Sequence, residues 1–208
     1  SKYSLHKHAY YSKFIYRAFK NLSDRFFAFL AILLLSPILF VVAFLVGWRL
    51  GPPVIFLQRR SGYRGRPFWL LKFMTMTDAR DPNGVLLPDE QRLTPLGRFL
   101  RSTSIDELPA LINILRGELS FIGPRPLLME YLPLYSHEQT RRHDVKPGFS
   151  GWAQINGRNA IAWEEKFRLD VWYVDHQNFW LDLRIFFLTI LKVIFQEGIS
   201  ASGEATMA

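Results

Sequence analysis

The sequence predicts a mainly α-helical fold with one small β-hairpin and one helix that enters a membrane. Residues 26–48 predict the membrane helix, because they are uncharged and apolar over roughly the 20 residues that a bilayer-crossing helix needs. Residues 53–73 predict the hairpin, because two short apolar runs flank a basic turn that contains Gly and Pro. Most later segments repeat apolar residues at helical spacing.

The apolar run contains a helix breaker near its midpoint, at Ser36-Pro37. Proline lacks the N–H that would donate to the carbonyl of Leu33, so a bend is expected, and the Ser36 hydroxyl is a candidate for a compensating hydrogen bond. Cationic residues stand on both sides of the run, and the positive-inside rule then places both ends on the cytoplasmic side. These residues leave two arrangements open: a re-entrant hairpin, and a spanning helix with a proline bend.

The remaining elements follow from turn signals and periodicity. Residues 78–91 are polar and contain the turn signal of residues 81–84, which predicts a surface loop. The last helix has a broad apolar arc, which suits a helix at the membrane interface and equally a buried core helix. The predicted helices cover residues 94–101, 102–119, a Leu- and Tyr-rich segment that ends at Tyr135, 160–175 and 179–195, with a Gly-rich loop over 146–159.

Composition narrows the function classes. A net charge of +8 attracts anions, which include nucleic acid, anionic lipid head groups and phosphorylated small molecules. The chain has no cysteine, which excludes disulfides, thiolate zinc sites and a cysteine nucleophile. It also lacks a Walker A loop, a dinucleotide-binding glycine motif and the histidine spacing of a helical zinc protease site.

Two adjacent acids, Asp106 and Glu107, are the first candidates for chemistry. Ser104 stands three residues before Glu107, which is the form of a capping box, and acids at a helix start are stabilising in any case. Helix capping is therefore the favoured interpretation of the pair taken alone. Pro109 removes an N–H that would bond back to Ile105, so a plain helix start is not expected.

Several cations beside turns or helix ends raise the case for a phosphate site. Arg125 is the clearest, because Pro124 and Pro126 restrict its backbone, Gly123 permits a close approach, and its guanidinium suits bidentate phosphate binding. Residues 156–159 enter a predicted helix, whose N-terminus favours an anion. The cations are Lys72, Arg101, Arg125 and Arg158.

The motifs together resemble a known family, the monotopic phosphoglycosyl transferases of bacterial sugar-transferase type, and most closely its small members. The likeness runs over nearly the whole chain, from about residue 22 to 206. It rests on the apolar run with Ser36-Pro37 and on the segments WLLKFMTM (69–76), RSTSIDELPALINILRGELSFIGPRPLLMEYLP (101–133) and RHDVKPGFSGWAQINGRNAIAWEEKF (142–167).

The resemblance implies roles for particular residues. Asp106 is expected to be the nucleophile, Glu107 a ligand of Mg²⁺, and Ser36-Pro37 the break of a re-entrant helix. Asp182 is expected to bind substrate or to anchor one of the cations. The implied fold is a re-entrant helix-break-helix packed on a cytoplasmic catalytic domain with interfacial amphipathic helices. Its expected divisions are a basic N-terminal extension (1–21), the re-entrant hairpin (22–50), the catalytic domain (51–197) and a mobile C-terminal tail (198–208).

The implied reaction moves a sugar-1-phosphate from a UDP-sugar to undecaprenyl phosphate and releases UMP. The expected setting is the cytoplasmic face of a bacterial inner membrane, with an N-acetylated amino sugar as donor and no nucleic-acid partner; the sequence does not indicate the oligomeric state. Two other functions stay open: a non-catalytic module that binds anionic lipid or nucleic acid, and a transferase in which the lipid phosphate attacks directly. The second class has many apolar segments, whereas this chain shows one.

Overall fold

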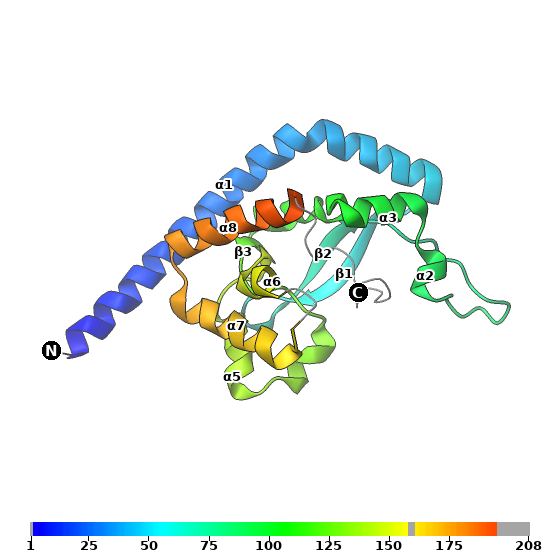
Figure 1. Ribbon diagram of the computed structural model, residues 1–208. Coiled ribbons are helices and arrows are strands. Elements are labelled where there is room, and N and C mark those ends of the chain that lie inside the picture. Colours follow the sequence, from blue (N-terminus) through cyan, green and yellow to red (C-terminus); the bar gives the residue numbers. More distant parts are fainter. Residues whose placement is uncertain (1, 158–160, 195–208) are drawn as a thin grey trace.

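The computed structural model describes residues 2–157 and 161–194. Its largest element is helix α1 (Lys2–Leu50), which arches over the rest of the molecule and bends once (Figure 1). Pro37 lies inside α1, and the Ser36 hydroxyl donates to the carbonyl of Leu33 at 2.8 Å. The predicted bend and its compensating hydrogen bond are therefore confirmed.

The bent helix differs from the predicted hairpin in one respect. Helical structure continues through Pro37, so no loop separates the two arms of α1. Within the part of the chain that the structure describes, residues 15–50 are the one stretch long and apolar enough to cross a membrane. Proline bends a helix without ending it when its neighbours hold the surrounding turns, as Ser36 does here.

The β-hairpin is confirmed. Strand β1 (Ile55–Ser61) pairs antiparallel with β2 (Pro67–Phe73), and the short 3-10 helix η1 (Tyr63–Gly65) forms the turn. The polar loop that follows contains the predicted turn, because the Asp81 carboxylate accepts hydrogen bonds from the backbone N–H groups of residues 83 and 85. The loop ends in a single helical turn, α2 (Asp89–Arg92).

The next helices begin close to the predicted positions, with one exception. Helix α3 (Pro95–Ser102) starts where expected, and Thr94 caps it by accepting from the N–H of Gly97 at 2.9 Å. The predicted helix over 102–119 is wrong in its first half. The chain forms instead a short 3-10 helix, η2 (Ile105–Glu107), and then helix α4 (Ala110–Arg116).

The C-terminal half contains a second strand pair that the sequence did not predict. Strands β3 (Ser120–Ile122) and β4 (Gly148–Ser150) pair in parallel, and three residues each are too few to show an alternating pattern. The segment that ends at Tyr135 is a 3-10 helix rather than an α-helix. The other elements are η3 (Met129–Leu134), α5 (His137–Thr140), η4 (Arg141–Asp144), α6 (Trp152–Asn156), α7 (Trp163–His176) and α8 (Phe179–Ile194).

Both arms of α1 pack on the domain below them. Ala28, in the first arm, belongs to a buried cluster with residues of β2 and α4, such as Leu70 and Ile114. Val46, in the second arm, is buried with Phe73 and with residues of α3. The apolar helix is thus docked directly on the elements that carry the predicted site residues.

Candidate active site

The backbone around the two acids is not a helix cap. Ser104 has a left-handed conformation, with φ of 57°, and makes no side-chain capping bond. Asp106 and Glu107 lie in η2, and α4 begins only after Pro109. The capping interpretation is therefore wrong, and the expectation that Pro109 prevents a plain helix start is confirmed.

Glu107 is held by two of the predicted cations. Its Oε1 accepts a hydrogen bond from Lys72 Nζ at 2.8 Å and one from Arg125 Nη2 at 3.0 Å. Burial alone would raise the pKa of Glu107, but the two positive charges and their hydrogen bonds outweigh it and lower the pKa to about 2. This carboxylate is therefore ionised at any physiological pH.

Asp106 has a different environment. Its side chain is buried, and burial together with the negative charge of Glu107 raises its pKa to about 6, although Lys72, Arg101 and Arg125 act in the opposite direction. An acid with this pKa is mostly ionised at neutral pH but poorly solvated, as suits a nucleophile. The pKa values of the two adjacent acids are therefore well separated, which is typical of carboxylates with separate roles.

Arg101 reaches this region from the last turn of α3. Its Nε donates to Thr75 Oγ1 at 3.1 Å. The close packing of α3 on this segment depends on Gly97, where a Cβ would lie 1.9 Å from the carbonyl oxygen of Thr75. Any larger residue at 97 would push α3, and Arg101 with it, away from Asp106.

The backbone of the loop that carries Arg125 is held by buried residues that were not predicted from the sequence. Arg142 Nη2 donates to the Arg125 carbonyl at 2.7 Å and to Asp170 Oδ2 at the same distance. Arg142 and Asp170 are almost completely buried. No local pattern links these residues, because η4 and α7 bring them together from distant parts of the chain. Gly123 allows the loop to pass Lys146, whose carbonyl would lie 2.4 Å from a Cβ.

Two further polar residues complete the site. Arg60 is buried, and burial and the nearby Arg125 lower its pKa to about 10, with Glu107 opposing; it lines one cavity with Lys72, Glu107 and Arg125. Asn113 is fully buried and binds the β2 backbone just before Lys72, accepting from the N–H of residue 71 and donating to the carbonyl of residue 69. Neither side chain stands in a recognisable local motif.

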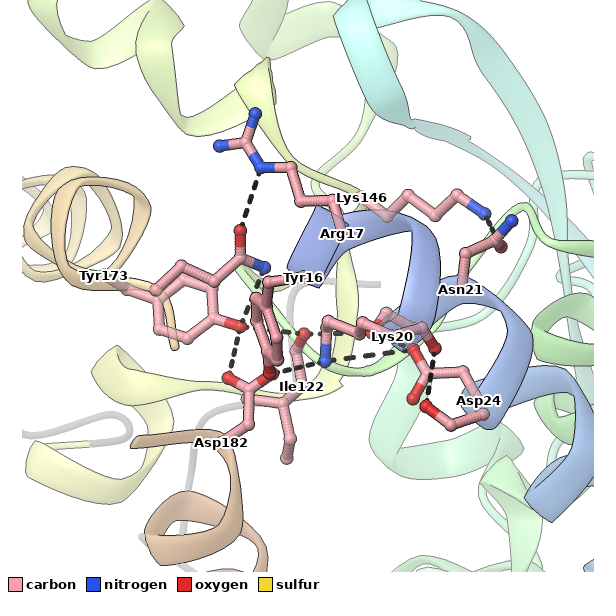
Figure 2. Close-up of polar contacts among 12 residues, drawn as sticks. Tyr16, Arg17, Lys20, Asn21, Asp24, Ile122, Lys146, Tyr173 and Asp182 are labelled. Carbon is pink, nitrogen blue, oxygen red and sulfur yellow. Dashed lines mark hydrogen bonds and ion pairs between the residues drawn. The ribbon is translucent and has the colours of Figure 1, made fainter. Parts of the chain in front are cut away.

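Asp182 lies in a separate polar cluster (Figure 2). Its Oδ2 accepts from Tyr16 Oη and Lys20 Nζ, both at 2.6 Å, and its Oδ1 accepts from Tyr173 Oη at 2.6 Å. Asp24 joins through Lys20, whose Nζ lies 3.8 Å from its Oδ2, and Ser120 joins through Asp24, to which its hydroxyl donates at 2.5 Å. Asp182 thus connects α8 to α1 instead of joining the cations around Glu107. We call Tyr16, Lys20, Asp24, Ser120, Tyr173 and Asp182 the Asp182 cluster.

Two of the predicted features, Arg158 and the tail 198–208, lie outside the described residues. Within residues 2–157 and 161–194, no group of three or more His, Cys, Asp or Glu side chains is arranged to hold a metal ion. Magnesium is commonly held by one or two carboxylates together with substrate phosphates and water, so the carboxylate of Glu107 fits Mg²⁺ better than it fits a metal that needs a full protein cage.

The chain is similar to known sugar transferases over most of its length. A family model described as bacterial sugar transferase matches residues 15–196. The uncharacterized sugar transferase EpsL of Bacillus subtilis is 61% identical, over 81% of this chain and 83% of that protein.

Two UDP-glucose:undecaprenyl-phosphate glucose-1-phosphate transferases are also similar. Those of Klebsiella pneumoniae and Escherichia coli are 40% and 38% identical over 84% and 85% of this chain, which spans 40% of each of them. With a family match over residues 15–196 and a relative that is 61% identical, the chain belongs to the bacterial sugar transferase family.

Proposed function

We propose that the protein transfers a sugar-1-phosphate from a UDP-sugar to undecaprenyl phosphate and releases UMP, through a covalent intermediate on Asp106. The observation that carries the proposal is the contrast between the two acids: Asp106 is buried with a pKa of about 6, and Glu107 is ionised between Lys72 and Arg125. The names of the similar transferases support the same general reaction.

The first step is attack by an Asp106 oxygen on the phosphorus that carries the sugar. A new oxygen–phosphorus bond forms, the bond to the bridging oxygen breaks, and UMP leaves with the bonding electron pair. In the second step an oxygen of the lipid phosphate attacks the same phosphorus and displaces the Asp106 carboxylate. The Asp106 carboxylate is mostly ionised near pH 7, so the first step needs no general base to activate it.

The cations offset the charge that would otherwise repel this attack. Lys72 and Arg125 face the carboxylates directly, and Arg60 adds a third positive charge to the same cavity. Glu107 is the proposed ligand of Mg²⁺, which when bound would neutralise phosphate charge. Arg101 and Arg158 are proposed to contact the donor diphosphate, whereas the contacts of Asp182 favour a role in holding α1.

The proposed setting is the cytoplasmic face of the inner membrane, with α1 entering the bilayer and returning. The bend at Pro37, the buried side chains in both arms and the flanking cations support this arrangement. Because the chain lacks cysteine, single cysteines at the exposed positions Ala18 and Arg66 can be labelled from either side of the membrane. Labelling from the same side is expected, and labelling from opposite sides would establish a spanning helix.

The activity is tested with a panel of UDP-sugars, undecaprenyl phosphate and Mg²⁺. UMP release is expected with at least one donor, and an N-acetylated amino sugar is proposed as the preferred one. Asp106→Asn should abolish release, whereas Asp78→Asn, at an exposed acid in the polar loop, should leave it unchanged. A non-catalytic lipid-binding module would release no UMP with any donor in the panel, and it would bind lipid equally well with Asn at position 106.

A further inference from the structure

The first arm of α1 holds the parallel strand pair that precedes the Arg125 loop. Strand β3 begins at Ser120, whose hydroxyl donates to Asp24 Oδ2 at 2.5 Å. Two residues before β4, Lys146 donates from its Nζ to Asn21 Oδ1 (Figure 2). Residues three positions apart share one face of a helix, so a single face of α1 bonds to both sides of the strand pair.

The contact between Asp24 and Ser120 is buried. Ser120 is 1% exposed, and the side chain of Asp24 is 14% exposed. The Ser120 hydroxyl also lies 3.1 Å from the carbonyl oxygen of Ile122, at the end of the same strand. Because a buried carboxylate that loses a hydrogen-bond donor is costly, this contact fixes β3 on α1 more firmly than a surface contact would.

The backbone between β3 and Arg125 is held against β4. The N–H of Gly123 donates to a carbonyl of β4 at 2.8 Å, and the N–H of Gly148 donates to the carbonyl of Pro124 at 2.9 Å. A Cβ at Gly148 would lie 2.0 Å from the Gly123 nitrogen, so the two segments are in direct contact. Through these contacts a shift of β3 is transmitted to Arg125, which directly follows Pro124.

The guanidinium of Arg125 depends on this backbone for its position. Its side chain is 49% exposed, so packing does not fix it, and its Nη2 donates to Glu107 Oε1 at 3.0 Å. A hydrogen bond of this length weakens strongly when its donor and acceptor separate by about a further 0.5 Å. A small movement of β3 is therefore enough to separate Arg125 from Glu107.

We propose that Asp24 and Ser120 are positioning residues for the transfer reaction. Their hydrogen bond sets β3 on α1 and thereby places Arg125 against Glu107, so the site is complete only while the first arm of α1 is docked. Neither Asp24 nor Ser120 lines the cavity that contains Lys72, Glu107 and Arg125, so both act through the strand. This inference rests on the proposed function, because it assigns roles within that reaction.

The test compares Ser120→Ala with Ser136→Ala, a matched control that removes the capping hydroxyl of α5. UMP release by the full chain in detergent is measured against UDP-sugar concentration at saturating undecaprenyl phosphate. Ser120→Ala should lower kcat/KM by about tenfold, because a misplaced catalytic group costs up to about 10²-fold, and Ser136→Ala should leave it unchanged. If Ser120→Ala does not unfold cooperatively, Asp24→Ala, which removes the acceptor from the helix side, takes its place.

Combination with Arg125→Lys separates a positioning role from a merely structural one. If Ser120 acts through Arg125, Ser120→Ala should cost at most about twofold in kcat/KM once lysine stands at position 125. A loss by the same factor in both backgrounds would overturn the inference, as would wild-type kinetics of Ser120→Ala alone.

Amide hydrogen exchange gives a readout that does not depend on the reaction. The N–H groups of residues 121–125 should exchange about tenfold faster in Ser120→Ala, whereas those of the β-hairpin should exchange as in the wild type. Unchanged exchange over 121–125 would overturn the inference. Faster exchange in a protein whose wild type releases no UMP with any donor would refute the proposed function and still support the connection between α1 and Arg125.

Discussion

At the scale of single residues, Asp106 and Glu107 differ because their neighbours differ. Glu107 receives hydrogen bonds from two cations, so its negative charge is compensated within the site. Asp106 is buried beside that charge, and among the described residues it is compensated by the longer-range attraction of Lys72, Arg101 and Arg125, so its pKa stays raised, at about 6. One residue position thus separates an acid suited to hold a metal ion from an acid suited to attack phosphorus.

The buried ion pair behind the Arg125 loop gives a first prediction. Asp170→Asn leaves the Arg142 guanidinium buried without a charged partner, which should lower the free energy of unfolding by about 3–5 kcal/mol. Denaturant unfolding in detergent measures the change. The double variant Arg142→Met and Asp170→Leu should recover much of the stability but not the activity, because the hydrogen bond to the Arg125 carbonyl is still missing. Full activity in the double variant would contradict a positioning role for Arg142.

His143 gives a prediction about pH. Its Nδ1 donates to the carbonyl of Gly62, its Nε2 is buried with no partner among the described residues, and burial together with the charge of Arg142 lowers its pKa to about 4. Histidine in the unfolded chain has a pKa of 6.5, so the unfolded state binds the proton first as pH falls. Stability is therefore complete above pH 6.5 and should fall between about pH 6.5 and 4, by up to about 3 kcal/mol.

Thermal unfolding across this pH range measures the effect. His143→Gln keeps a donor for Gly62 but does not titrate, so it should remove the loss of stability toward pH 4 that this histidine causes. The opposite contribution of Asp106, whose raised pKa makes the folded state bind its proton first, should remain. His137→Gln, at an exposed position in α5, serves as the matched control and should not change the profile. A pH profile of His143→Gln identical to that of the wild type would contradict this role of His143.

At the scale of elements, the bend of α1 allows both arms to rest on one domain. Pro37→Ala restores an N–H that can donate to the Leu33 carbonyl and favours a straight helix by about 3 kcal/mol. A straight helix cannot keep both Ala28 and Val46 buried, so one arm should leave the domain. We expect reduced transferase activity and a changed labelling pattern of cysteines at positions 18 and 66. Leu34→Ala, at an exposed site in the same helix, is the control, and wild-type behaviour of Pro37→Ala would contradict this role of the bend.

Elements with strong local signals could be predicted from the sequence, and those that depend on distant contacts could not. The hairpin over 53–73 and helix α8 follow from turn residues and apolar spacing, and they lie where the pattern places them. Strands β3 and β4 are three residues long and form only because they meet each other. The 3-10 helix around Asp106 follows from Ser104 in a left-handed conformation, which no local preference for serine indicates.

At the scale of the whole molecule, the same division holds for the site. Asp106, Glu107, Lys72 and Arg125 could be named from the sequence and its resemblance to a family, and the structure brings all four together. Arg142, Asp170 and Asn113 could not be named, because they act through buried contacts between segments far apart in the chain. They fix the backbone behind the reactive groups, and such supporting contacts leave no spacing pattern in the sequence.

The arrangement of the whole chain places the cationic site directly beneath the long apolar helix α1. Both arms of α1 pack on the elements that carry Lys72 and Arg101, so the site has a fixed position relative to the helix. This arrangement suits a reaction that joins a water-soluble nucleotide sugar to a lipid whose phosphate lies at the head-group level. In the proposed covalent mechanism the two half-reactions can be separated, because only the second needs the lipid.

That separation gives the most direct test of the central claim, that Asp106 forms a covalent intermediate. The enzyme is mixed with its UDP-sugar and Mg²⁺ in the absence of polyprenyl phosphate, UMP is measured over one turnover, and the protein is analysed by intact mass and peptide mapping. We expect a burst of about one UMP per enzyme and a phosphosugar adduct on Asp106, both lost in Asp106→Asn. UMP release that requires the lipid, with no adduct at any time, would show direct attack by the lipid phosphate and contradict the account.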